Sequence, residues 1–220
     1  MKASASLRLG LAATLMSLGV LAVPATAPAA PAPAVQAYAR LHGNPVGSYT
    51  VDPDHSLAQF SVGHAGVAML SGDFSKISGS YTFDPRHPKD CKADISIPVN
   101  TIATFLPMRD KDLLDTAFFD ASKYPTMHFV STRYVPHGLH HGVLLGELTL
   151  RGVTRPVRFR VHLLGAGKVG YLPKPWGGYL TGFVATTVID RTAFGMDAYA
   201  SGIGHKVRVR VEIEGVRKSS

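Results

Sequence analysis

The sequence predicts an all-β fold, a closed antiparallel barrel of about eight strands with one short α-helix around residues 108–119. Many segments alternate apolar and polar residues with period two, and Gly, Pro and Asp separate them. Only one stretch after the first 39 residues has helical spacing. Strands with one apolar face each favour a barrel because closure removes sheet edges, whereas a two-sheet sandwich is the structural alternative.

The first 39 residues have the order of a secretory signal. Lys2 and Arg8 precede an apolar run from Leu9 to Val23, and an Ala- and Pro-rich tract follows. The run is short for a membrane span of about 20 residues, so an uncleaved anchor is the less favoured alternative. We expect residues 1–39 to be signal peptide and leader, and residues 48–216 to form the exported domain.

Length, charge and cysteine content narrow the function classes. About 180 residues remain after the leader, enough for one domain with a sizeable core. Removing Lys2 and Arg8 lowers the net charge from +8 to +6, which suits an anionic head group, transient contact with a membrane surface, or simply solubility. The charges are spread along strands, so nucleic acid is not expected. Cys91 is the single cysteine, which excludes an intramolecular disulfide.

The first half of the domain contains short strand patterns and the helix. Strands are predicted at 48–52, 57–62, 79–83 and 95–99, with Pro98 at an edge or bulge. The glycine-spaced stretch between the second and third of these strands argues against a stable helix, although it leaves room for a single turn around Val67 to Leu70. Amphipathic spacing then predicts the helix.

The second half is organised around a hairpin. Residues 143–150 and 157–164 alternate as two strands, joined by a compact turn within Arg151–Pro156. Further strands are predicted at 127–135, 180–191 and 207–214. A flexible Gly- and Pro-rich loop is expected from Gly165 to Gly178.

Motifs that carry chemistry are weak in this chain. Gly165–Gly170 has the letters of a dinucleotide fingerprint, but no helix can begin in the Pro-rich segment that follows. Asp54-His55-Ser56 are adjacent on an extended chain and cannot form a catalytic relay. His137, His140 and His141 are interpreted as an exposed hairpin tip, with a metal site as the alternative. We therefore expect no catalytic residue, no bound metal and no cofactor.

Ordered motifs across almost the whole domain resemble those of the YceI-like family of periplasmic proteins. They are Tyr49-Thr50-Val51-Asp52 with His55-Ser56, Phe60-Ser61-Val62 with His64, Gly72-Asp73-Phe74 with Gly79, Arg109-Asp110 with Leu113, Phe118-Phe119-Asp120, Tyr124-Pro125, Gly146 to Thr154, and Arg191 to Met196. The resemblance implies a periplasmic, lipocalin-like barrel that binds a polyisoprenoid chain in an elongated apolar channel. Ile203-Gly204-His205-Lys206-Val207 departs from the family's usual Ile-Gly-Asp-Glu-Val, which bears on head-group preference.

The expected function is non-enzymatic binding of a long apolar ligand, an isoprenoid lipid or a quinone-like relative. The residues expected to line the lumen are Phe60, Val62, Phe74, Tyr81, Phe83, Ile95, Ile97, Phe129, Leu148, Leu150, Val157, Phe159, Val161 and Phe183. A filled core is the alternative for the same residues, because an eight-strand barrel is either filled or hollow.

Basic residues within the matched motifs are head-group candidates: His64, Arg109 and Arg191. The alternative for Arg109 is a surface ion pair with Asp112. Two further function classes stay open, an envelope stress or interaction protein with an incidental lumen, and a metal-dependent hydrolase using His137, His140 and His141. The oligomeric state is also open, a homodimer included.

Overall fold

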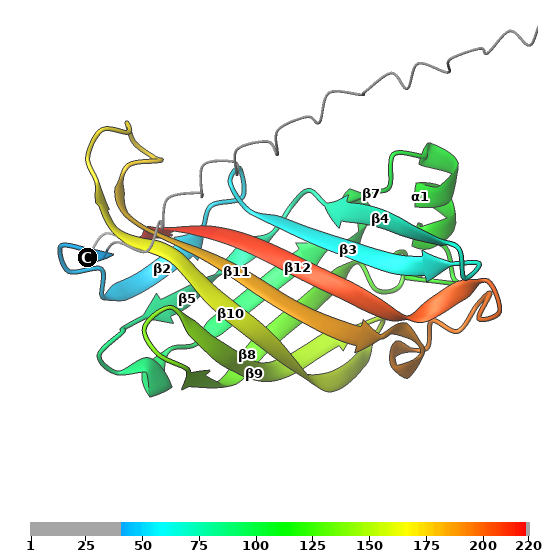
Figure 1. The fold of residues 1–220 in the computed structure, drawn as a ribbon. Coiled ribbons are helices and arrows are strands. Elements are labelled where there is room, and N and C mark those ends of the chain that lie inside the picture. Colours follow the sequence, from blue (N-terminus) through cyan, green and yellow to red (C-terminus); the bar gives the residue numbers. More distant parts are fainter. Residues whose placement is uncertain (1–40, 219–220) are drawn as a thin grey trace, which may run out of the picture. The chain divides into compact units, whose positions relative to one another are not determined.

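The chain folds as an up-and-down antiparallel barrel, seen from the side in Figure 1. The computed structural model describes residues 41–218, so the predicted leader lies outside the described residues. The strands are β1 (Leu41–His42), β2 (Gly47–Val51), β3 (Leu57–His64), β4 (Ala68–Phe74), β5 (Ser78–Phe83), β6 (Ala93–Pro98), β7 (Ile102–Ala103), β8 (Thr126–Pro136), β9 (His141–Leu150), β10 (Val153–Val169), β11 (Gly178–Asp190) and β12 (Ile203–Arg217).

β1 pairs in parallel with the end of β10 and adds no strand to the ring. Three of the other strands are interrupted, so the remaining eleven segments form eight barrel strands. β2 and β3 both pair with β12 and together form one barrel strand. β5 pairs with β2 and β4 with β3, so β4 and β5 form the next strand. β6 pairs with β5 and β7 with β4, so β6 and β7 form the third. The break between β6 and β7 is the 3-10 turn η2 (Val99–Thr101), which begins directly after Pro98. Pairing of β12 with β11 on one side and with β2 and β3 on the other closes the ring. The predicted barrel is confirmed.

Two tight hairpins have left-handed turn residues. Arg151 and Gly152 have φ of 52° and 71° and join β9 to β10 at the predicted place. Ala65 and Gly66 have φ of 50° and 69° and join β3 to β4. Two successive residues with positive φ are characteristic of type I′ hairpins, whose twist matches that of the strands. No turn forms over Val67 to Leu70, because the chain turns earlier and β4 begins at Ala68.

The expected loop from Gly165 to Gly178 is also too long. β10 extends to Val169, with a register shift between Leu163 and Gly165, and only residues 170–177 form the connection to β11. Gly165 pairs with Gly182 and Gly167 with Leu180. Ladder hydrogen bonds to β11 outweigh the low strand propensity of these glycines, which is why the composition was misleading.

The helix α1 (Pro107–Leu114) is shorter than predicted. Asp115 has an extended backbone, with φ −77° and ψ 172°, and its carboxylate accepts the Thr116 N–H at 2.6 Å. An Asp side chain that bonds its own backbone competes with helical hydrogen bonds, so the helix ends here. Two other short 3-10 helices are η1 (Pro88–Asp90) and η3 (Arg191–Phe194). Within residues 41–218, no helix is long and apolar enough to cross a membrane.

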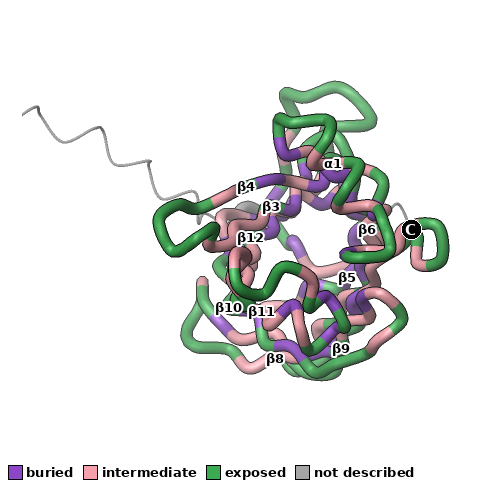
Figure 2. Tube along the Cα trace, turned by 90° about the vertical axis from the view of Figure 1, so that its right-hand side faces the viewer, coloured by how far each residue is buried: buried purple, intermediate pink, exposed green. Residues whose placement is uncertain are grey.

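The strands form a ring when viewed from the side on which α1 lies, as Figure 2 shows. Alternate residues of each strand face the inside of the ring, where the buried side chains form one hydrophobic cluster. At the end of the barrel formed by β2 and β5, Tyr49 is fully buried and stacks on Tyr81 with ring centroids 5.4 Å apart. A Cβ at position 215 would overlap the Tyr81 hydroxyl, so Gly215 is required for this packing.

Candidate ligand cavity

The barrel encloses an apolar cavity of about 500 Å³. Alternate residues of β12 form one wall, Val207, Val209, Val211 and Ile213, and the cavity extends to α1, where Leu113 borders it. Pockets of about 300–1,000 Å³ with mostly apolar walls and a few polar groups are typical of small-molecule sites. The geometry suits an apolar ligand.

The residues predicted to line a lumen fall into two groups. Those that border the cavity are Phe60, Val62, Phe74, Ile95, Ile97, Phe129, Leu148, Leu150 and Phe159. Those that pack in the hydrophobic cluster without bordering the cavity are Tyr81, Phe83, Val157, Val161 and Phe183. The barrel is therefore hollow in part and filled in part, and neither of the two alternatives describes it completely.

Aromatic contacts fix the walls of the cavity. Phe74 contacts Phe60 and Phe119 with ring centroids 5.7 Å apart in both pairs, and the Phe119 contact is edge-on. Phe129 and Phe159 meet edge to face at 5.2 Å. Such pairs are worth about 0.5–1.5 kcal/mol beyond their buried area, so the cavity has a defined shape.

The filled end contains a second aromatic group. The Phe183 ring meets the edges of Tyr81 and Phe83 at 5.6 and 5.7 Å, and the Tyr81 hydroxyl bonds to the buried Thr181 hydroxyl. Burial raises the pKa of Tyr81 and brings that of Tyr49 to about 12, so both phenols stay neutral. β2 and β5, which contain Tyr49, Tyr81 and Phe83, lie at the end of the barrel remote from α1 (Figure 1).

Arg191 is a buried guanidinium beside the cavity. Its Nε donates to the Gly204 carbonyl at 3.0 Å and its Nη2 to the Ile203 carbonyl at 2.9 Å, while Nη1 donates to Met196 at 2.5 Å. Burial lowers its pKa, although Asp197 and Asp190 act in the opposite direction. These bonds fasten the segment after η3 to the start of β12, so the Arg191 side chain has a structural role.

Arg109 also borders the cavity, from the first turn of α1. Its Nε donates to Thr104 Oγ1 at 2.8 Å and its Nη2 to the Thr104 carbonyl at 2.5 Å. Asp112, its expected alternative partner, forms no ion pair with it within the part of the chain that is described. Arg109 therefore lies at the α1 end of the cavity with its guanidinium only half-buried. His64, by contrast, is exposed at the end of β3 and does not border the cavity.

Several lining residues were not predicted. The β12 valines have the clearest alternation of apolar and polar residues in the sequence, and this pattern was sufficient to identify them as inward-facing. Leu113, Phe119, Met196 and Tyr199 come from α1 and the turns after α1 and η3. Leu113 belongs to the predicted helix, whereas no periodicity marks Phe119, Met196 and Tyr199, because irregular backbone directs these side chains inward.

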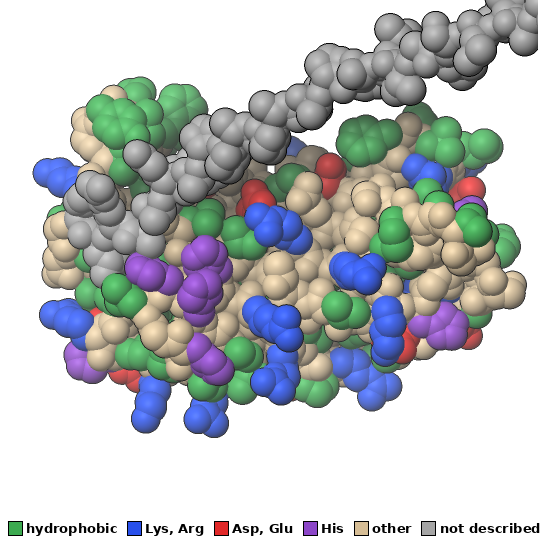
Figure 3. Space-filling model, in the orientation of Figure 1, with side chains coloured by type: hydrophobic (Ala, Val, Ile, Leu, Met, Phe, Trp, Pro, Cys, Tyr) green, Lys and Arg blue, Asp and Glu red, His purple; other side chains and the backbone are tan. Residues whose placement is uncertain are grey.

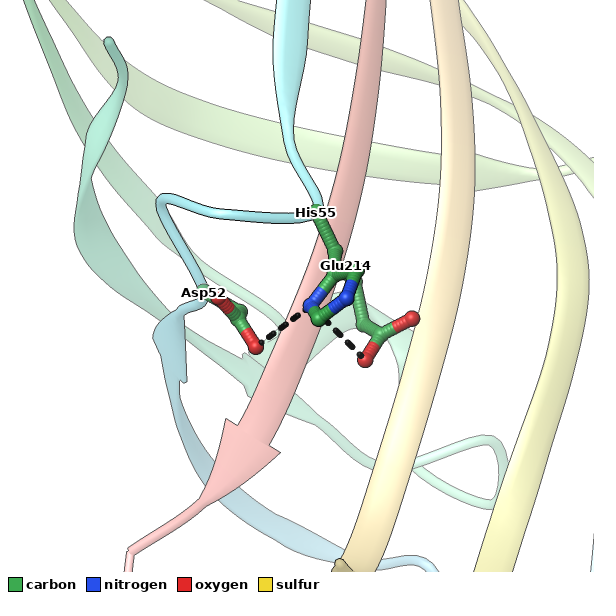
Figure 4. A group of neighbouring side chains, drawn as sticks. All are labelled: Asp52, His55 and Glu214. Carbon is green, nitrogen blue, oxygen red and sulfur yellow. Dashed lines mark hydrogen bonds and ion pairs between the residues drawn. The ribbon is translucent and has the colours of Figure 1, made fainter. Parts of the chain in front are cut away.

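The only described group of three metal-ligand side chains lies elsewhere, on the wall where β2 meets β12 (Figure 4). His55 Nδ1 is 3.0 Å from Asp52 Oδ2 and 4.0 Å from Glu214 Oε1. Ser56 bonds both the N–H and the carbonyl of Glu214, so this turn is fastened to β12. His137, His140 and His141 do not converge in this way; His141 instead stacks on His162 at 4.4 Å. Among the described residues, His137, His140 and His141 therefore do not form the metal-ligand group that the hydrolase alternative needs.

Comparison with known proteins agrees with the motifs. Residues 49–215 match the YceI-like domain. A UPF0312 protein of Pseudomonas fluorescens is 34% identical over 176 residues, covering 77% of this chain and 86% of its own length. A UPF0312 protein of Photorhabdus laumondii is 35% identical over 173 residues, covering 78% of this chain and 87% of its own.

Solved structures share the barrel at lower identity. Burkholderia cenocepacia BcnA has a TM-score of 0.66 at 22% identity, covering 76% of this chain and 99% of its own. A polyisoprenoid binding domain from Saccharophagus degradans has a TM-score of 0.57 at 15% identity, covering 77% of this chain and 98% of its own. These two structures show the shared fold only, whereas the domain match and the two UPF0312 relatives show the family. The chain belongs to the YceI-like family.

Proposed function

We propose that this protein is a periplasmic carrier that holds a long apolar lipid, a polyisoprenoid or quinone-like molecule, in its barrel. The apolar cavity carries the proposal. Each buried CH₂ contributes about 0.8 kcal/mol, so an alkyl or prenyl chain binds there without specific chemistry. The name of the Saccharophagus degradans domain supports the isoprenoid class, and the N-terminal signal pattern supports export.

Two arginines beside the cavity are bonded to the protein itself. Arg191 donates to three backbone carbonyls, and Arg109 donates to the hydroxyl and the carbonyl of Thr104. Arg109 lies at the α1 end of the cavity and is only half-buried. We propose that Arg109 orients a ligand's polar head at this end.

The test is mass spectrometry of an organic extract from the purified protein. We expect a prenyl lipid to co-purify with the wild type and to be depleted from Ala185→Phe, which places a ring in the cavity. Val130→Phe adds a ring on the outside of the barrel and is the matched control, since Val130 is 40% exposed. Thermal unfolding confirms that both variants fold. Absence of any lipid from wild type and control would overturn the carrier.

A further inference from the structure

One face of the barrel gathers four arginines from two strands. Arg158 and Arg160 alternate with inward residues on β10, and Arg208 and Arg210 do so on β12. β11 runs between them and pairs Thr186 with both Arg160 and Arg210. Because two inter-strand spacings separate them, the backbones of Arg160 and Arg210 lie about 10 Å apart. Figure 3 shows basic side chains over these strands.

The positive charge of this face is mostly uncompensated. Arg210 pairs with Glu212, with Nη2 2.6 Å from Oε1. Arg158, Arg160 and Arg208 have no carboxylate within 4.0 Å among the described side chains. Sequence separation concealed this cluster, because the arginines of the two strands are about fifty positions apart and meet only through the sheet.

The arginines line a shallow groove of about 860 Å³ on the outer wall. Its other sides include Gln59, Ser71 and Asp73, so one further carboxylate is present. Two apolar side chains project there without cover: Val188 is 56% exposed between the arginine strands, and Phe105 is 88% exposed. Phe105 follows Thr104, which borders the internal cavity. The groove therefore adjoins the α1 end of the barrel.

We propose that this arginine groove docks the protein on an anionic phospholipid bilayer. Guanidinium groups bind phosphate oxygens in bidentate fashion, and exposed aromatic and aliphatic residues among basic ones suit the head-group layer. A second copy of the chain would place like charges against each other. Docking by this face brings the α1 end of the cavity beside the bilayer. The biological role of this docking rests on the proposed function, since a lipid carrier collects its ligand from a membrane.

The test is co-sedimentation of the full-length purified protein with vesicles. Vesicles of phosphatidylcholine with 30% phosphatidylglycerol, a fraction chosen on the order of natural anionic content, are compared with pure phosphatidylcholine at low salt. Each basic residue near an anionic surface is worth a factor of about five. Arg158→Ser/Arg160→Ser/Arg208→Ser should therefore weaken binding to the anionic vesicles about 100-fold.

The matched control is Lys89→Ser/Lys92→Ser/Arg133→Ser, three exposed basic residues outside the groove with the same loss of charge. It should retain most of the binding, and Phe105→Ser should weaken binding without changing net charge. Equal loss in both triple variants overturns the groove, as does wild-type protein that ignores anionic vesicles. Binding to heparin but not to vesicles assigns the face to an acidic glycan and also overturns the bilayer. Co-purified lipid is measured separately, so failure here leaves the carrier proposal intact.

Discussion

At the scale of single residues, the cavity depends on side chains that are both packed and in its wall. Phe159 is 8% exposed, meets Phe129 edge to face and borders the cavity. Its sequence neighbours Arg158 and Arg160 are exposed. One strand position therefore separates a residue that determines stability and cavity shape from residues that determine surface charge.

Phe159→Ala should lower the free energy of unfolding by about 3–5 kcal/mol, because it removes a buried ring from a packed wall. Prenyl-lipid affinity should change as well, since the wall of the cavity changes. Arg160→Ser is the control, and its effect on stability should stay within about 0.5 kcal/mol. Chemical denaturation and lipid titration measure the two effects. Equal damage from both substitutions would refute the strand register, and unaltered lipid affinity in Phe159→Ala would remove this ring from the ligand site.

His55 gives a pH dependence of stability. Its hydrogen bond to Asp52 raises the pKa of the imidazole despite the opposing effect of burial, and burial raises the pKa of Glu214 beside it. A raised folded-state pKa means that the folded chain binds the proton more tightly. The His55 contribution is therefore complete below the unfolded pKa of about 6.5 and is lost as pH rises through the folded value.

The difference in melting temperature between wild type and His55→Gln should thus be largest near pH 5.5 and smallest near pH 8.5. The imidazole is half exposed, so the difference should not exceed about 4 °C. His64→Gln is the control, because His64 forms no ion pair within the described chain. A His55→Gln difference that is constant with pH would show that the Asp52 contact does not stabilise the fold.

At the scale of elements, alternation predicted most of the strands and missed β1, β4 and β7. β12 and the β9–β10 hairpin follow period two and lie where expected. β4 contains Gly72, whose missing Cβ makes room for the Phe60 ring and Thr104. That glycine looked like a loop residue, because close approach between strands is a property of the assembled barrel.

The segment after η3 has no regular pattern and depends on Arg191. Arg191→Ala leaves three carbonyls without their donor and should lower the free energy of unfolding by about 3–5 kcal/mol. Arg191→Lys should recover only part of this loss, because one ammonium cannot reproduce the planar donor fork. Arg155→Ala is the control, since Arg155 is exposed and makes one bond, to Ala193 at 3.3 Å. A melting temperature within about 2 °C of wild type for Arg191→Ala would show that this segment holds without the guanidinium.

At the scale of the whole molecule, the sequence predicted a closed barrel but did not show which part of its interior is filled and which is hollow. Inward aromatic residues such as Phe83 and Phe159 have the same alternating context. One is packed against Phe183 and the other borders the cavity. The difference arises from which rings meet across the barrel, and contacts between strands far apart in sequence leave no local signal. The same reason explains why the arginine groove was read as dispersed charge.

Closure of the barrel makes a final prediction about the ends of the domain. Each described barrel strand begins at Gly47 or later, so removal of residues 1–39 should leave a cooperative thermal transition. Removal of residues 1–56 is the matched comparison. It deletes β2, leaves the end of β12 and β5 without their shared partner, and takes away the fully buried Tyr49 that stacks on Tyr81. An open, apolar sheet edge should then abolish cooperative unfolding and favour aggregation. Calorimetry distinguishes the outcomes: loss of the transition in the shorter deletion would move the domain boundary into the leader, and its survival in the longer one would show that β2 does not close the barrel.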